Sequence, residues 1–365
     1  MIVYFVILST VLLGALVADS AASAIGRTSG PLFDRDILVN PRRAHTVWDW
    51  LPVLLLVGFL GSRVGVGTDY PLYATLYGRT EPEYWAYTLR ESPQEIGYTV
   101  LQLLAKSVEL EFQSFLWLMA FLTVVPVALA LRREALPLTV GLAGYVMAGH
   151  YLASFNIMRQ GAAMSLILLA VTLLPRRTWF LVLSVLAGLL HSSAIPVAAL
   201  LYLAKSVRPT PKLLVAAVGG GLVLAVVYAS SSIVLNVALA LNPRYGDYLD
   251  GDGSGIGTYL VAAAHLLLVS MLVLRREHLN ARTARYTTYA ILGLPFILLG
   301  TQSVVLGRLE LYFAIFLIPA YAAIWSQLRP VVRWGLTLGM LAYFVAYASS
   351  FGDLLPYVSS LTTRS

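Results

Sequence analysis

Arg159 lies about one turn inside an apolar stretch of residues 156–174. A charge in the hydrocarbon region of a membrane costs about 2.5 to 3.5 kcal/mol on insertion scales, so it needs a partner or a function. A guanidinium offers two parallel donors that match a phosphate, and Gln160 adds a polar group beside it. The sequence therefore predicts an anion-binding arginine. A snorkelling arginine and a structural ion pair with Asp69 or Glu95 are the alternatives.

His191 is followed by two hydroxyl side chains, Ser192 and Ser193. An imidazole exchanges protons near neutral pH, so it can take a proton from an incoming sugar hydroxyl. Asp69 and Glu95 are acids that could act as the base or orient an arginine. These three residues are the candidate catalytic groups, and a hydrogen-bonded packing role is the alternative for the histidine.

The chain that must position these groups is 59% hydrophobic and 12% charged over 365 residues, which excludes a soluble fold. It has no cysteine, so disulfides, thiol nucleophiles and cysteine metal sites are excluded as well. Apolar runs long enough for about ten to twelve membrane crossings recur along the chain. We predict an all-α polytopic membrane protein that forms a single domain over residues 1–365.

The net charge of +7 comes from short clusters of arginine and lysine between apolar runs. Such clusters mark cytoplasmic loops rather than a nucleic-acid surface, and they place the N-terminus outside. The stretch between Arg177 and Lys205 must then cross an even number of times, although it is too short for two full helices. We predict a re-entrant or broken hairpin with its turn at His191. A single long tilted helix is the alternative.

Two segments are predicted as extracytoplasmic loops. Residues 63–111 carry seven acids and four bases, and Ile96, Val100 and Leu104 recur at helical spacing within them. This spacing predicts an amphipathic helix at the membrane interface. Residues 242–255 form the second loop, which contains Arg244. Its Asp-Gly-Asp-Gly run lacks the later bidentate acid of a calcium loop, so no metal site is predicted.

The predicted topology brings charged residues that are distant in sequence to one membrane face. Several bases together with acids suggest an anionic ligand that is rich in hydroxyl groups. The glycines between Arg63 and Tyr70 permit a close backbone approach to such a ligand, while an ordinary helix exit capped by Asp69 is the alternative. The charged residues of this face are Arg63, Asp69, Glu95, Arg159, His191, Arg244 and Arg308.

Four short motifs resemble the EpsG family of bacterial exopolysaccharide-synthesis membrane proteins, which are similar to Wzy-type polymerases. The motifs are Val66-Gly67-Thr68-Asp69 with Tyr73, Glu95-Ile96-Gly97-Tyr98, Arg159-Gln160 and His191-Ser192-Ser193-Ala194. Leu190 departs from the pattern, because the family usually has an aromatic residue before the histidine. Arg244 and Arg308 are weaker matches.

The resemblance implies a glycosyltransferase-C-like helical bundle in the bacterial inner membrane, acting on the extracytoplasmic side. It implies polymerisation of undecaprenyl-diphosphate-linked saccharides, or a related lipid-linked glycosyl transfer, and contact with other polysaccharide-assembly proteins. Because arginines can stabilise the departing diphosphate, no metal or other cofactor is predicted. The predicted substrate-binding residues are Arg63, Tyr70, Tyr98, Arg159, Gln160, Arg244 and Arg308. A flippase for the same lipid-linked saccharide and a non-catalytic assembly subunit are the alternative functions.

Overall fold

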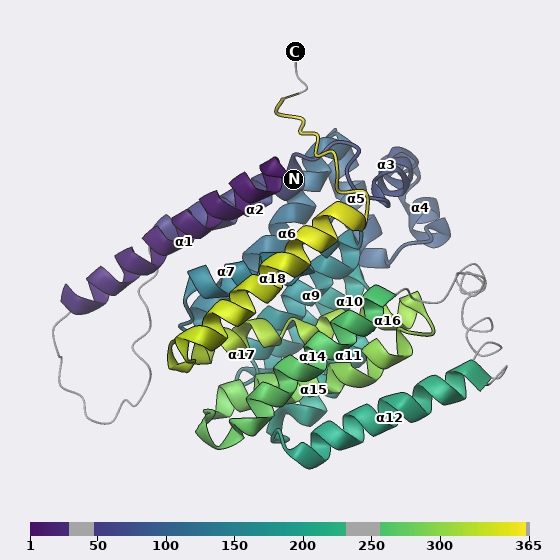
Figure 1. The fold of residues 1–365 in the computed structure, drawn as a ribbon. Coiled ribbons are helices and arrows are strands. Elements are labelled where there is room, and N and C mark those ends of the chain that lie inside the picture. The colour runs from purple at the N-terminus through teal and green to yellow at the C-terminus, as the bar shows by residue number, and fades with distance from the viewer. Residues whose placement is uncertain (29–46, 231–255, 363–365) are drawn as a thin grey trace. The chain divides into compact units, whose positions relative to one another are not determined.

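The computed structural model describes residues 1–28, 47–230 and 256–362, which form helices and turns without a strand (Figure 1). The predicted all-α class is therefore confirmed. The chain divides into two compact units, Met1–Ala198 with Ile324–Ser365 and Ala199–Ala323. The prediction that the whole chain forms a single membrane domain stays a prediction.

Six helical segments in the described ranges are long and apolar enough to cross a membrane, so the polytopic prediction is confirmed. They are Ile2–Ala21, Phe112–Arg133, Pro211–Tyr228, Gly257–Leu274, Leu306–Gln327 and Pro330–Ser350. Five shorter apolar helices accompany them. A helix of fifteen residues, the length of Met158–Thr172, spans about 22 Å at 1.5 Å per residue, less than the roughly 30 Å of a bilayer core. The number of crossings therefore stays a prediction.

The first unit is built around two helices, α6 (Phe112–Arg133) and α9 (Met158–Thr172), which pack against each other. Its remaining helices are α1 (Ile2–Thr28), α2 (Trp50–Gly61), α3 (Tyr70–Gly78), α4 (Trp85–Glu91), α5 (Ile96–Ser107), α7 (Leu138–Met147), α8 (His150–Ala153), α10 (Arg177–Leu190) and α18 (Pro330–Ser350). Helix α2 packs against α6 on one side and α1 on the other, whereas α10 packs against α9 and α5.

A buried arginine fastens one end of this unit. Arg132 Nη1 lies 3.0 Å from Asp19 and Nη2 lies 2.6 Å from Asp49. Asp19 also accepts hydrogen bonds from the backbone N–H groups of Leu138 and Thr139, each at 3.0 Å. Helices α1, α6 and α7 are thus tied together by charge-assisted hydrogen bonds, which stabilise a buried charge only when it is fully paired.

Two apolar helical stretches are broken by short turns. Between α7 and α8, Gly149 has φ +85°, and a Cβ there would lie 2.9 Å from the Tyr343 ring of α18. Only glycine fits this left-handed turn against a close neighbour. Helix α10 ends at Leu190, His191 is extended, and α11 (Ala194–Leu203) follows. The predicted break at His191 is confirmed and the single long helix is wrong, whereas the re-entrant course of a hairpin in the membrane stays a prediction.

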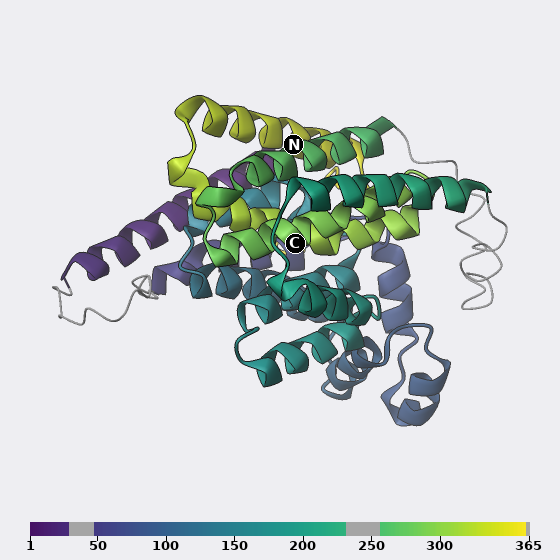
Figure 2. The same ribbon diagram turned by 90° about the horizontal axis from the view of Figure 1, so that it is seen from below.

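The second unit contains α12 (Pro211–Ser230), α14 (Ile256–Leu274), α15 (Ala281–Leu299) and α16 (Val304–Ala314). Helix α15 packs against the other three (Figure 2). His265 of α14 is buried, with Nδ1 2.5 Å from Glu310 of α16 and Nε2 2.9 Å from the carbonyl of Ala290 in α15. The histidine therefore links three helices of the second unit.

Candidate active site

Glu95 stands at the centre of a charged cluster in the first unit. One carboxylate oxygen pairs with Nη1 of Arg159. The other lies 2.8 Å from Nδ1 of His191 and accepts a hydrogen bond of 3.3 Å from the backbone N–H of Ser192. Three segments far apart in sequence thus meet at one carboxylate, and all three had been predicted to contribute to the site.

The turn before α5 fixes the position of Glu95. Glu95 has an extended backbone at the N-cap position, and Ser92 accepts a hydrogen bond of 3.2 Å from the N–H of Gln94. The hydroxyls of Ser92 and Thr99 are 2.9 Å apart, which ties the incoming turn to the first turn of the helix. The carboxylate is therefore held at a helix N-terminus, where negative charge is favourable.

Helix ends also place the two partners of Glu95. Arg159 is the second residue of α9, and His191 follows the last residue of α10. Helix α10 approaches α5 closely at Gly97, where a Cβ would lie 2.5 Å from the Cβ of Leu189. The glycine of the Glu95-Ile96-Gly97-Tyr98 motif therefore permits the close packing that brings His191 to Glu95.

The cluster is partly exposed, with 16% of the Glu95 side chain, 23% of Arg159 and 27% of His191 accessible to solvent. Burial alone would raise the pKa of Glu95, but the hydrogen bond to His191 and the positive charge of Arg159 outweigh it and lower the pKa to about 2. Glu95 is therefore ionised at neutral pH. Such a carboxylate is a weak base and is better suited to orienting its two partners.

Aromatic side chains surround Arg159. Its guanidinium carbon lies 5.6 Å from the ring centre of Tyr98, and the hydroxyl of Tyr73 is a hydrogen-bond partner of the guanidinium. The Tyr98 hydroxyl and Arg159 Nε are buried without a hydrogen-bond partner. Unpaired buried donors are costly, so these two atoms keep a hydrogen-bonding capacity that the described side chains do not use. Tyr73 was not among the predicted substrate-binding residues, although the resemblance included it.

Arg63 lies deeper in the first unit, with 1% of the residue exposed. Its guanidinium donates to the carbonyl of Leu60 at 2.9 Å and lies 5.1 Å from the ring centre of Phe155. Burial is the main cause that lowers the pKa of Arg63. The predicted substrate-binding role stays a prediction, because in this structure the side chain packs inside the protein.

The C-terminal segment after α18 lies along the loop that begins at Arg63, an arrangement the sequence did not predict. Gly67 N–H donates to the carbonyl of Asp353 at 3.0 Å, and Thr68 N–H donates to that of Gly352 at 3.2 Å. The side-chain amide of Asn156 links these two segments. It accepts a hydrogen bond from Thr68 Oγ1 at 3.1 Å and donates one to the carbonyl of Gly352 at 3.2 Å. Asn156 lies three residues before Arg159, so this contact anchors the start of α9.

The other predicted site residues are placed as follows. Asp69 precedes α3 without a side-chain cap hydrogen bond, and Tyr70 packs against Phe112 with ring centres 5.4 Å apart. Gln160 is buried in α9. Arg308 belongs to α16 of the second unit, where Glu310 pairs with His265, and Arg244 lies outside the described residues. No group of three or more potential metal ligands occurs within the described ranges.

The fold and this cluster define a polytopic helical membrane protein with an arginine, a carboxylate and a histidine at converging helix ends. The family model described as EpsG family matches residues 47–359. The chain therefore belongs to the EpsG family, as its motifs suggested, and the family indicates a role related to exopolysaccharide synthesis. No curated protein and no solved structure matches it.

Proposed function

We propose that this chain polymerises polyprenyl-diphosphate-linked saccharides into an exopolysaccharide at the extracytoplasmic face of the bacterial inner membrane. The observation that carries the proposal is the meeting of Arg159, Glu95 and His191. The cluster combines a phosphate-binding cation with a proton acceptor, which are the two groups that glycosyl transfer from a diphosphate requires. Family membership supports the coarser role in exopolysaccharide synthesis.

His191 is the proposed general base. Its Nδ1 faces Glu95, which leaves Nε2 to take the proton from the hydroxyl of the acceptor sugar. The hydroxyl oxygen then attacks the anomeric carbon of the donor, and the bond between that carbon and the phosphate oxygen breaks. Its electron pair goes to the diphosphate. Glu95 remains ionised, keeps the imidazole in one orientation and stabilises the imidazolium that forms.

Arg159 is the proposed phosphate ligand. The guanidinium lies at the start of α9, where the helix dipole adds to its positive charge. Negative charge develops on the departing diphosphate, so a cation held in place before the reaction lowers the barrier. The part of the Arg159 side chain that is accessible to solvent, 23% of it, would face the phosphate oxygens.

The test is reconstitution in vesicles with purified lipid-linked repeat units, followed by analysis of product size. We expect wild-type protein to form chains longer than one repeat, and His191→Gln to form them at least about 100-fold more slowly. His278→Gln is the matched control, because His278 is exposed in the second unit. Translocation of intact repeat units without formation of a glycosidic bond would overturn the proposal in favour of a flippase.

A further inference from the structure

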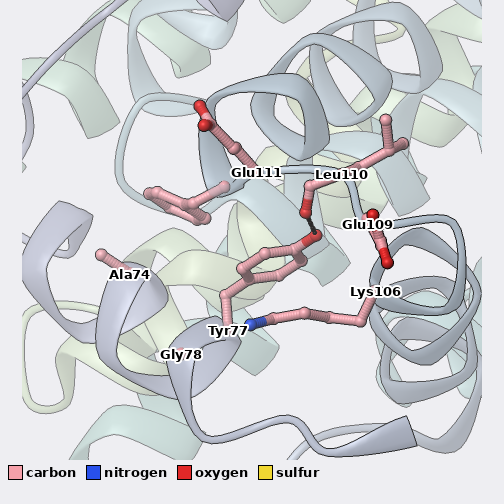
Figure 3. Close-up of a pocket in the computed structure, with 8 residues that line it drawn as sticks. Ala74, Tyr77, Gly78, Lys106, Glu109, Leu110 and Glu111 are labelled. Atoms are coloured by element: carbon pink, nitrogen blue, oxygen red, sulfur yellow. Dashed lines mark hydrogen bonds between the residues drawn. The ribbon is translucent and has the colours of Figure 1, made fainter.

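A concave site lies in the segment between α3 and α6. It is a groove of about 510 Å³ lined by Ala74 and Tyr77 of α3, Lys106 of α5, and Glu109, Glu111 and Phe112 where α5 passes into α6 (Figure 3). None of these residues belongs to the Arg159 cluster. The groove is therefore separate from the proposed reaction centre.

The floor of the groove is rigid. Tyr77 donates a hydrogen bond of 2.6 Å to the carbonyl of Leu110, and its ring stacks on Phe115 with centres 5.0 Å apart. Glu109 has φ +56°, and its backbone N–H donates a hydrogen bond of 3.0 Å to the backbone carbonyl of Lys106. The turn that holds Glu109 and Glu111 is therefore closed by backbone hydrogen bonds. A ligand would meet a preformed surface, which lowers the entropic cost of binding.

Three charged side chains line the groove. The Lys106 ammonium lies 5.0 Å from the ring centre of Tyr77, and Glu109 and Glu111 are exposed. Among the described residues no ion pair joins these three groups to each other or to other side chains. One ammonium donor and two carboxylate acceptors at one surface match a ligand that carries many hydroxyl groups.

The charge of the groove distinguishes its ligand from that of the reaction centre. Lys106 with Glu109 and Glu111 gives a net charge of −1, which disfavours a diphosphate. The Arg159 cluster carries no net negative charge. The groove is thus suited to uncharged sugar residues that lie away from the lipid-linked end.

The wall behind the groove continues to the reaction centre. Tyr77 stacks on Phe115, whose ring centre is 5.5 Å from that of Tyr98, and Tyr98 in turn lies 5.6 Å from the Arg159 guanidinium carbon. Three buried aromatic rings in successive contact therefore connect the two sites through the interior of the first unit.

We propose that this groove binds sugar residues of a saccharide chain at a distance from the reacting end. The inference rests on the proposed polymerase function, and it adds a site that holds the chain between successive additions. Substitution of the charged residues that line the groove should shorten the polysaccharide product and weaken binding of lipid-free oligosaccharide. The rate of a single glycosyl transfer should stay the same.

The probe is a size-fractionated partial acid hydrolysate of the exopolysaccharide made by the producing organism, bound to purified full-length protein and detected by saturation-transfer NMR. Glu111→Gln and Lys106→Gln should each weaken binding about tenfold, as expected for loss of a hydrogen bond to a charged group. The matched controls are Glu83→Gln and Lys212→Gln, both exposed and outside the groove. Gel filtration confirms that each variant is folded.

Equal binding by the groove variants and the controls would overturn the inference. So would loss of binding to phosphatidylethanolamine vesicles rather than to the oligosaccharide, since that result assigns the groove to a lipid headgroup. Failure of the proposed function is recognised separately, because wild-type protein would then form no glycosidic bond in the reconstituted assay. His191→Gln should retain oligosaccharide binding, since His191 lies outside the groove.

Discussion

Replacement of Glu95 by glutamine tests the charged cluster most directly. The amide has nearly the same size as the carboxylate, so packing at the start of α5 is kept. What is lost is the negative charge that pairs with Arg159 and contacts His191. Both partners are less than one-third exposed, so water replaces the lost interaction only in part.

The magnitude follows from the pKa of Glu95. A fall from 4.5 to about 2, against the opposing effect of burial, corresponds to about 3 kcal/mol of folded-state stabilisation at neutral pH. Because the folded-state pKa is lowered, this contribution is present above pH 4.5 and is lost as the pH falls towards 2. Glu95→Gln should therefore reduce the free energy of unfolding at pH 7 and remove part of its acid dependence.

The assay is denaturant unfolding of purified protein in detergent between pH 7 and about pH 3. Glu91→Gln is the control, because Glu91 is 56% exposed and its nearest base, Arg90, is 3.9 Å away. That exposed pair should contribute at most about 1 kcal/mol. The ion-pair argument is wrong if Glu95→Gln lowers the free energy of unfolding no more than Glu91→Gln does. It is also wrong if the pH dependence of that free energy is the same in Glu95→Gln as in the wild-type protein.

Three further predictions concern Arg159, Gly352 and the role of divalent cations. Arg159→Lys should reduce product formed per molecule at least about 100-fold with normal membrane abundance, since lysine lacks the planar donors that hold a phosphate, and near-normal turnover would refute the phosphate role. Gly352→Ala should lower the free energy of unfolding by at least about 2 kcal/mol in thermal denaturation, because Gly352 has φ +73° and a Cβ there would lie 2.1 Å from Asn156. Gly339→Ala is the control and should not lower the free energy of unfolding, because a Cβ there meets no atom within 4 Å. Chelation of divalent cations should leave activity intact, and loss that is restored by a divalent ion would contradict the charge-stabilisation mechanism.

Apolar composition predicted the all-α membrane class because the cost of unpaired backbone groups in lipid leaves few alternatives. The break at His191 was also predictable, since the charges at Arg177 and Lys205 constrain the intervening stretch. The break at Gly149 was not. It depends on the close approach of Tyr343 from α18, nearly 200 residues away in sequence, and no local pattern reports such a contact.

The site was predictable where a charge stands in an apolar environment. Arg159 drew attention because its insertion is costly, and Glu95 had been considered as its partner. The burial of Arg63 was not predictable, because its neighbours Phe155 and Met158 become contacts only through tertiary packing. The pairing of Gly352 with Thr68 depends on backbone hydrogen bonds, which carry no residue signature.

Arg132 and Arg159, the two arginines of the first unit that pair with aspartate or glutamate over long sequence separations, show why only one is suited to bind an anion. Arg132 faces both Asp19 and Asp49, a group with a net charge of −1 that would repel a phosphate. Arg159 shares the single carboxylate of Glu95 with His191, so its group is neutral and becomes positive when the histidine takes a proton. Proton transfer from the acceptor to His191 would therefore increase the positive charge beside the diphosphate as its negative charge develops. Base and anion ligand would in this way act together through one carboxylate, which explains why removal of Glu95 should impair both.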